Sequence, residues 1–291
     1  MMKKIIILLT GVLLASCSDQ KLAESLAAVK DAGIPTENAD STTDIRALIE
    51  RARWGDGQAY LKLADCYRDG IDVKKDFLGM LAMIEQAQTR GAIHDEKEYI
   101  TQIPDSNDLK DLYYLLEKCD KPQGEEKDNA MAQLAANDSP DASAWLGFMC
   151  VQSGDSIRGL ELITDASERG SSLGTLLNAF LYYRGNNRPD KAKLEQFAAK
   201  TPMVYKMLGQ LSRRPDENGK VDEREVAYYY LKADEHALLS RWEARWLLDY
   251  HEDVGIPGLT DEDVERLQAF ARYPDEIDEA MVDSTYVDSI Q

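Results

Sequence analysis

The stretch that decides the fold of this chain is residues 57–91, GQAYLKLADCYRDGIDVKKDFLGMLAMIEQAQTRG. Apolar side chains in each half recur three or four positions apart, the spacing that puts them on one face of an α-helix. A glycine-led break at residues 70–73 separates the halves, and Gly91 follows the second. The pattern therefore predicts a helical hairpin. The apolar positions are Ala59, Leu63, Ala64 and Tyr67 in the first helix, and Phe77, Leu81, Ile84 and Ala87 in the second.

Parts of this unit recur later in the chain, which indicates an array of hairpins. The recurring pieces are Ala87–Gly91 with Ala166–Gly170, Leu146-Gly147 with Leu208-Gly209, and Tyr67–Gly70 with Tyr182–Gly185. Self-similarity at a period of roughly 30 to 45 residues is typical of a solenoid. No sustained alternation of apolar and polar residues suggests strands. We therefore expect an all-α fold whose stability comes from contacts between neighbouring hairpins.

Residues 57–91 resemble the Sel-1-like repeat, a branch of the tetratricopeptide superfamily. The shared features are an alanine-led helix, a leucine followed by glycine or alanine, a Tyr-x-x-Gly turn and a closing Ala-x-x-x-Gly. The resemblance implies a right-handed α-solenoid of about six helix-turn-helix repeats within residues 44–272, with helix formation starting at Asp44. We expect the helix pairs near 57–91, 105–138, 139–170, 171–200, 201–237 and 240–271.

The amino-terminal residues resemble a bacterial lipoprotein signal peptide. Lys3 and Lys4 precede a short apolar run, and Leu14-Ala15-Ser16-Cys17 matches the lipobox pattern of that family. The resemblance implies cleavage after residue 16 and lipidation of Cys17, with residues 17–43 as a flexible tether. It places the protein in the cell envelope. Ser18 suggests the outer membrane, Asp19 would suit surface export in other bacterial groups, and the sequence leaves the periplasmic and surface faces open. An ordinary signal peptide with an incidental cysteine is the alternative.

The charge of the chain bears on its partners. The formal net charge is −19, or −21 without Lys3 and Lys4, when 32 basic side chains face 53 acidic ones. Such a surface repels nucleic-acid phosphates and anionic lipid headgroups, so membrane association has to come from the lipid on Cys17. Residues 273–291 contain six acidic and no basic side chains, which predicts a disordered acidic tail.

The remaining polar chemistry does not favour an enzyme. Cys66, Cys119 and Cys150 lie in apolar helical contexts and are expected to be buried thiols, with one disulfide between two of them left open. The chain has three histidines, His94, His236 and His251, and none has a second histidine at the helical spacing of metal ligands. No nucleophile elbow, phosphate loop or zinc motif is present. We therefore expect no catalytic residue, cofactor or metal.

Aromatic and arginine side chains supply the candidate contact positions. Tyr228-Tyr229-Tyr230 cannot all face one side of a helix, so at least one should be exposed. Trp242, Trp246 and Tyr250 recur four positions apart and are expected to pack between repeats, or to form a binding patch with the adjacent arginines. First helices of tetratricopeptide-like arrays line the binding face. By that resemblance the candidates are Tyr60, Arg68, Tyr205, Arg213, Arg241 and Arg245.

Together these features predict a lipid-anchored scaffold that binds an envelope protein on its helical-repeat surface. Its acidic surface also suits an immunity or inhibitor protein that neutralises a basic toxin or hydrolase. A cell-wall-active enzyme ranks last, because the chain lacks a recognisable catalytic set.

Overall fold

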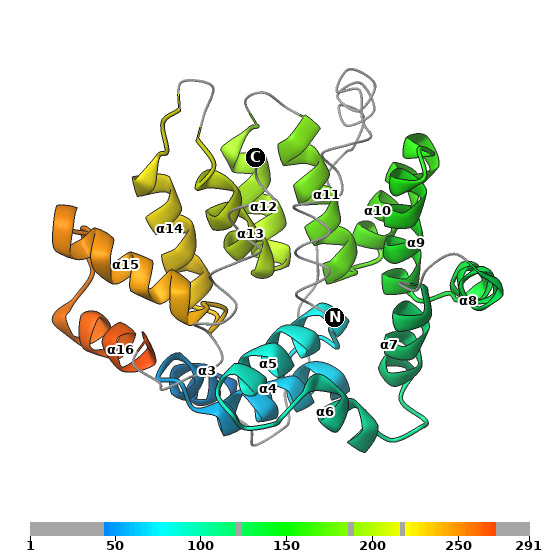
Figure 1. Cartoon of the computed structure of the whole chain (residues 1–291), viewed down its shortest axis with the longest axis horizontal. Coiled ribbons are helices and arrows are strands. Elements are labelled where there is room, and N and C mark those ends of the chain that lie inside the picture. Colours follow the sequence, from blue (N-terminus) through cyan, green and yellow to red (C-terminus); the bar gives the residue numbers. More distant parts are fainter. Residues whose placement is uncertain (1–43, 120–123, 186–188, 216–218, 272–291) are drawn as a thin grey trace.

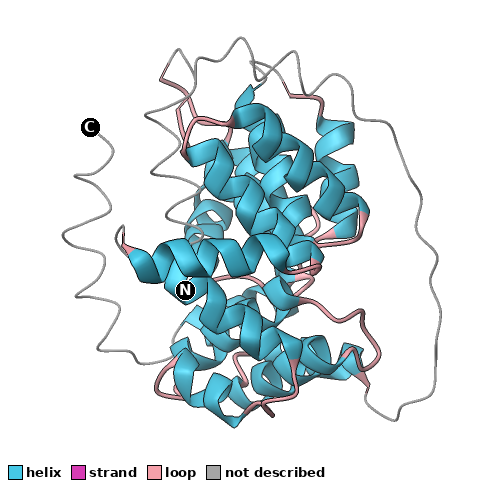
Figure 2. Ribbon diagram, turned by 90° about the vertical axis from the view of Figure 1, so that its right-hand side faces the viewer, coloured by secondary structure: helices cyan, strands magenta, loops and turns pink. Residues whose placement is uncertain are grey.

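A computed structural model describes residues 44–119, 124–185, 189–215 and 219–271. Within these ranges the chain forms fourteen α-helices and no β-strand (Figures 1 and 2). The all-α solenoid predicted from the sequence is therefore confirmed. The helices are α3 (Ile45–Arg53), α4 (Gly57–Asp69), α5 (Phe77–Thr89), α6 (Glu96–Gln102), α7 (Asp108–Cys119), α8 (Glu125–Ala136), α9 (Pro140–Gln152), α10 (Ser156–Glu168), α11 (Ser172–Gly185), α12 (Lys191–Lys200), α13 (Met203–Ser212), α14 (Glu223–Asp234), α15 (Arg241–Val254) and α16 (Asp261–Ala271).

Six pairs of these helices fall within the six predicted segments. They are α4 with α5, α7 with α8, α9 with α10, α11 with α12, α13 with α14 and α15 with α16. Sequential helices pack side by side, as expected for a repeat array (Figure 1). Two helices lie outside the pairs: α3, whose start the sequence predicts, and the seven-residue α6, which it does not.

Aspartates cap half of the fourteen described helices with their side chains. Asp56 shows the arrangement, because its carboxylate accepts hydrogen bonds from the backbone N–H groups of Gln58 at 2.9 Å and Ala59 at 3.1 Å. Such a cap satisfies N–H groups that have no partner within the helix. Part of the excess of acidic residues is thereby explained by local structure. The aspartates that cap helices with their side chains are Asp44, Asp56, Asp76, Asp95, Asp155, Asp190 and Asp222.

Glycines allow paired helices to approach closely. A Cβ atom on Gly147 of α9 would lie 2.7 Å from the carbonyl oxygen of Gly159 on α10. A Cβ atom on Gly209 of α13 would lie 2.5 Å from the ring of Tyr230 on α14. Both distances are shorter than a carbon atom tolerates, so the recurring Leu-Gly motif marks helix crossings, as the sequence predicts.

The array also curves back on itself, so that helices distant in sequence are in contact. Helix α16 lies beside α3, and α5 lies against α11 (Figure 1). At the second contact Lys74 Nζ donates to the Gly170 carbonyl at 2.7 Å, and Ser172 donates to Asp76. Contacts between distant repeats therefore add to the neighbour contacts expected of the array.

The cysteine side chains of the helices are free thiols. Cys66 and Cys119 are buried as predicted, whereas Cys150 is only half-buried. No two of the three form a disulfide, so the alternative that the sequence leaves open does not hold. Burial raises the pKa of each thiol, which keeps it protonated and unreactive near neutral pH.

Candidate interaction surface

The predicted lipidation site lies outside the residues that the structure describes. Cys17, the signal segment 1–16, the tether 17–43 and the acidic segment 273–291 all fall there. Among the described residues, no helix is both long enough and apolar enough to cross a bilayer. The candidate contact residues, by contrast, all lie within described helices or directly beside them.

Two of the predicted contact residues are core residues, and the sequence-based prediction for them is wrong. The side chain of Tyr60 is fully buried, and burial raises the pKa of its hydroxyl. Arg241 is only 7% exposed, and its Nη2 atom lies 3.5 Å from the Ala271 carbonyl oxygen at the end of α16. The first-helix position was right in both cases, but the side chain faces inward. Successive residues of a helix are rotated by about 100°, so residues of one helix can face either the core or the solvent. The repeat motif places the helix but does not tell which of these positions face outward.

Two further candidates are held by partners within the chain. Arg68 is half-buried and pairs with Asp65 at 2.7 Å and with Asp69. The hydrogen bonds that Arg68 donates to the Asp69 carboxylate are the main cause that raises the pKa of Arg68. The half-buried Tyr205 donates to Glu195 at 2.9 Å. The Arg68 guanidinium and the Tyr205 hydroxyl would each have to break a charge-assisted hydrogen bond before contacting a partner protein.

The last two candidates, Arg213 and Arg245, come together with Trp242 on neighbouring first helices. Arg213 directly follows α13, and its guanidinium carbon lies 3.8 Å from the ring centroid of Trp242 on α15. Trp242 is 41% exposed, and Arg245 is exposed one helical turn further along α15. We call these three residues the arginine–tryptophan patch. Within the described part of the chain, neither arginine forms an ion pair with a carboxylate.

Packed aromatic rings and a helix cap support the patch. Trp246 stacks on Tyr250 with ring centroids 5.3 Å apart, and the edge of buried Tyr230 meets Trp246 at 5.7 Å. The start of α15 is fixed by a capping box, in which Ser240 and Glu243 bond each other's backbone N–H groups. Trp246 thus packs between repeats as expected, Tyr250 stacks on it within α15, and Trp242 faces solvent.

The tyrosine triplet divides as the sequence predicts. Tyr229 and Tyr230 are buried, and Tyr228 is 45% exposed. Tyr228 donates to Glu195 at 3.0 Å, and Tyr205 donates to the other oxygen of the same carboxylate. Glu195 therefore ties α12 to both α13 and α14, a role that no sequence motif indicated.

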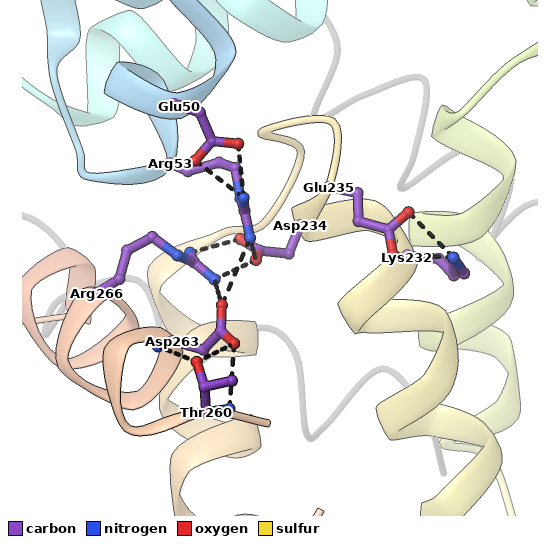
Figure 3. Close-up of polar contacts among 8 residues, drawn as sticks. All are labelled: Glu50, Arg53, Lys232, Asp234, Glu235, Thr260, Asp263 and Arg266. Carbon is purple, nitrogen blue, oxygen red and sulfur yellow. Dashed lines mark hydrogen bonds and ion pairs between the residues drawn. The ribbon is translucent and has the colours of Figure 1, made fainter. Parts of the chain in front are cut away.

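A buried charge cluster, which no sequence motif indicated, joins helices α3, α14 and α16 (Figure 3). Asp234, at the end of α14, accepts hydrogen bonds from Arg266 at 2.6 and 3.0 Å and from Arg53 at 2.9 Å. Arg53 belongs to α3 and Arg266 to α16, so one carboxylate links three elements. Close by, Arg90 stacks on Phe270 at 3.6 Å and donates to its carbonyl at 2.8 Å.

An open pocket of about 1230 Å³ lies between α11, α13, α14 and α15. Its wall mixes apolar side chains with charges of both signs, including Tyr183, Leu211, Arg224 and Glu225, and none of its lining residues is a histidine or cysteine. Among the described residues, no three histidine, cysteine or acidic side chains are grouped so that they could hold a metal ion.

The chain was compared with protein-family models, with curated proteins and with solved structures. No family model, curated protein or solved structure matches it. The resemblance to Sel-1-like repeats therefore stays a prediction from the sequence motifs quoted above.

Proposed function

We propose that this protein is a lipid-anchored scaffold of the bacterial cell envelope, of the Sel-1-like repeat type, that binds a partner protein through the arginine–tryptophan patch. The observation that supports this function is the exposure of Trp242 between two arginines on the first helices of neighbouring repeats. Tryptophan and arginine are the residue types that most often dominate binding energy at protein interfaces. The support from packed rings and the helix cap matters as well, because a patch that is already ordered loses less entropy on binding.

Capture of partners from bacterial envelope extracts tests the binding function. We expect Trp242→Ala to weaken capture at least tenfold, because truncating a central aromatic residue typically costs about 2 kcal/mol. Tyr228→Ala is the matched control, since Tyr228 is equally exposed but lies on α14, a second helix of its pair. Equal capture by wild type and the Trp242→Ala variant would contradict the assignment of the binding surface.

The anchor is a separate part of the proposal. Cys17 would carry the lipid, and the acidic body would otherwise have no attraction to anionic headgroups. A Cys17→Ser variant should lose acyl labelling and leave the membrane fraction while its helical circular dichroism stays unchanged. Retention of that variant in the membrane pellet would exclude lipidation at Cys17 as the anchor.

An envelope immunity or inhibitor protein is the second candidate function, and the net charge of −19 supports it. A strongly acidic protein attracts basic partners and speeds their association. This function predicts one basic toxin or hydrolase bound at one-to-one stoichiometry, whereas a scaffold would retain several envelope proteins. The stoichiometry of the captured material, measured by size-exclusion chromatography with light scattering, separates the two.

A further inference from the structure

The end of the described chain lies against the arginine–tryptophan patch. The carbonyl oxygen of Ala271, the last residue of α16, is 3.4 Å from Nη2 of Arg245. Arginines near a helix C-terminus interact favourably with its carbonyl groups and with the negative end of its dipole. The end of the described chain therefore lies next to Arg245.

The residues that follow have the opposite charge to the patch. Residues 273–291 carry six carboxylates and no cation, and four of the six come early, at Asp275, Glu276, Asp278 and Glu279. Arg213 and Arg245, by contrast, have no ion-pair partner among the described residues. In a protein of net charge −19, two such arginines beside an exposed tryptophan favour an acidic ligand.

The distances allow these two parts to meet. An extended chain spans roughly 3.3–3.6 Å per residue, so Asp275 reaches up to about 13 Å from Ala271. Arg245 is in contact with Ala271, and Trp242 lies one turn of α15 from Arg245. A short connection also gives the acidic segment an effective concentration on the order of millimolar at the patch. Exposed ion pairs are individually weak, so they form here only because this local concentration is high.

We infer that the acidic segment 273–291 docks on the arginine–tryptophan patch of its own chain and competes there with the partner protein. The inference rests on the proposed binding function of the patch and adds its regulation. A partner must displace the segment, so it has to present carboxylates of its own or bind more of the surface than the segment covers. Screening by salt should release the segment, because its contacts are exposed ion pairs.

A labelled peptide of residues 273–291 tests the docking without any partner. It is titrated against the full chain in mild detergent, and against a full chain in which the six tail acids are replaced by their amides (D275N, E276Q, D278N, E279Q, D283N and D288N). Fluorescence anisotropy should give a dissociation constant at least tenfold lower for the amide-tail variant, because its own tail no longer competes. In ~1 M salt the peptide should bind neither protein.

The binding surface is tested in the amide-tail variant. Arg213→Gln together with Arg245→Gln should abolish peptide binding, whereas Arg224→Gln, which removes an exposed arginine from α14, should leave it intact. Circular dichroism and thermal unfolding confirm that each variant is folded. Equal peptide affinity of wild type and the amide-tail variant, no binding to the amide-tail variant, or binding that survives loss of both arginines would each overturn the inference.

The outcome is independent of the search for a partner. If no envelope protein is captured, the peptide titration still decides whether the segment docks. If a partner is captured through Trp242 and binds wild type and the amide-tail variant equally, the proposed function stands and the regulation by the segment fails.

Discussion

At the scale of single residues, Gly209 shows why the repeat motif contains a glycine. The ring of Tyr230 occupies the space that a side chain at position 209 would need, and Tyr230 is itself fixed against Trp246. At Gly147 the atom nearest to an added Cβ, at 2.7 Å, would be a backbone oxygen, which cannot turn aside as a side chain can. Overpacking of this kind forces side chains out of their rotamers or shifts the backbone.

We therefore expect Gly209→Leu and Gly147→Leu each to lower the free energy of unfolding by about 3 kcal/mol. Urea denaturation followed by circular dichroism measures the change. Ala199→Leu is the matched control, because it adds a leucine at an exposed position of α12 and should change stability by less than about 0.5 kcal/mol. Wild-type stability of both glycine variants would show that the assigned helix crossings are wrong.

Asp141 makes the stability of the molecule depend on pH. Burial raises the pKa of this carboxyl to about 6, the neighbouring Asp76 carboxylate adds to the shift, and the hydrogen bond from Ser171 Oγ at 2.5 Å opposes it. In an unfolded chain an aspartate titrates near pH 4. The folded chain thus holds the proton more tightly, so the carboxyl stabilises the fold most below about pH 4, and this contribution is lost as the pH rises through about 6.

An Asp141→Asn variant stays neutral and still accepts a hydrogen bond from Ser171. At pH 7 we expect it to be more stable than wild type by up to about 3 kcal/mol, the equivalent of two pKa units, and near pH 4 the two should be equally stable. Urea unfolding over a pH series gives the comparison. The exposed Asp253→Asn should follow the wild-type profile, and a constant offset between Asp141→Asn and wild type at every pH would refute the explanation.

At the scale of helices, the sequence determines most of the pairs but not every element. The predicted pairs hold because their apolar spacing, turn glycines and small crossing residues all point to the same structure. Helix α6 was missed because seven residues show too little periodicity. A capping signal could have found it, since Asp95 accepts from the backbone N–H of Glu98 at 2.9 Å, and Glu98 in turn accepts from the backbone N–H of His94.

Helix α15, which carries most of the patch, depends on its first turn. Ser240 and Glu243 form a reciprocal capping box there, whereas Ser139 at the start of α9 makes no side-chain cap. Ser240→Ala should therefore cost about 1 kcal/mol in thermal or urea unfolding, and Ser139→Ala, the matched control, much less. Equal losses for the two serines would mean that the capping box contributes nothing.

At the scale of the whole molecule, the contact between the two ends could not be predicted from the sequence. Arg53 and Asp234 are 181 positions apart, and repeat motifs report only on neighbouring helices. Where the ends lie depends on the small rotation between successive repeats, summed over the array. The same limit applies to the candidate surface. The repeat motif predicts where the first helices lie. Only the folded chain shows that Tyr60 and Arg241 face inward and that Arg213 stacks on Trp242.

The joint between the ends gives a test that separates this molecule from an open array. Asp234 is buried between Arg53 and Arg266, so Asp234→Asn removes the charge that both arginines need and should cost about 3–5 kcal/mol. The adjacent Glu235→Gln is the matched control, because the one ion pair of Glu235 with a described residue is the surface pair with Lys232 (Figure 3). In an open array each repeat responds only to its neighbours, and damage at α14 would not reach α3. Here hydrogen exchange should rise together in α3 and α16 of the Asp234→Asn variant while α9 and α10 stay protected. Unchanged exchange in α3 would show that the ends of the array do not hold each other.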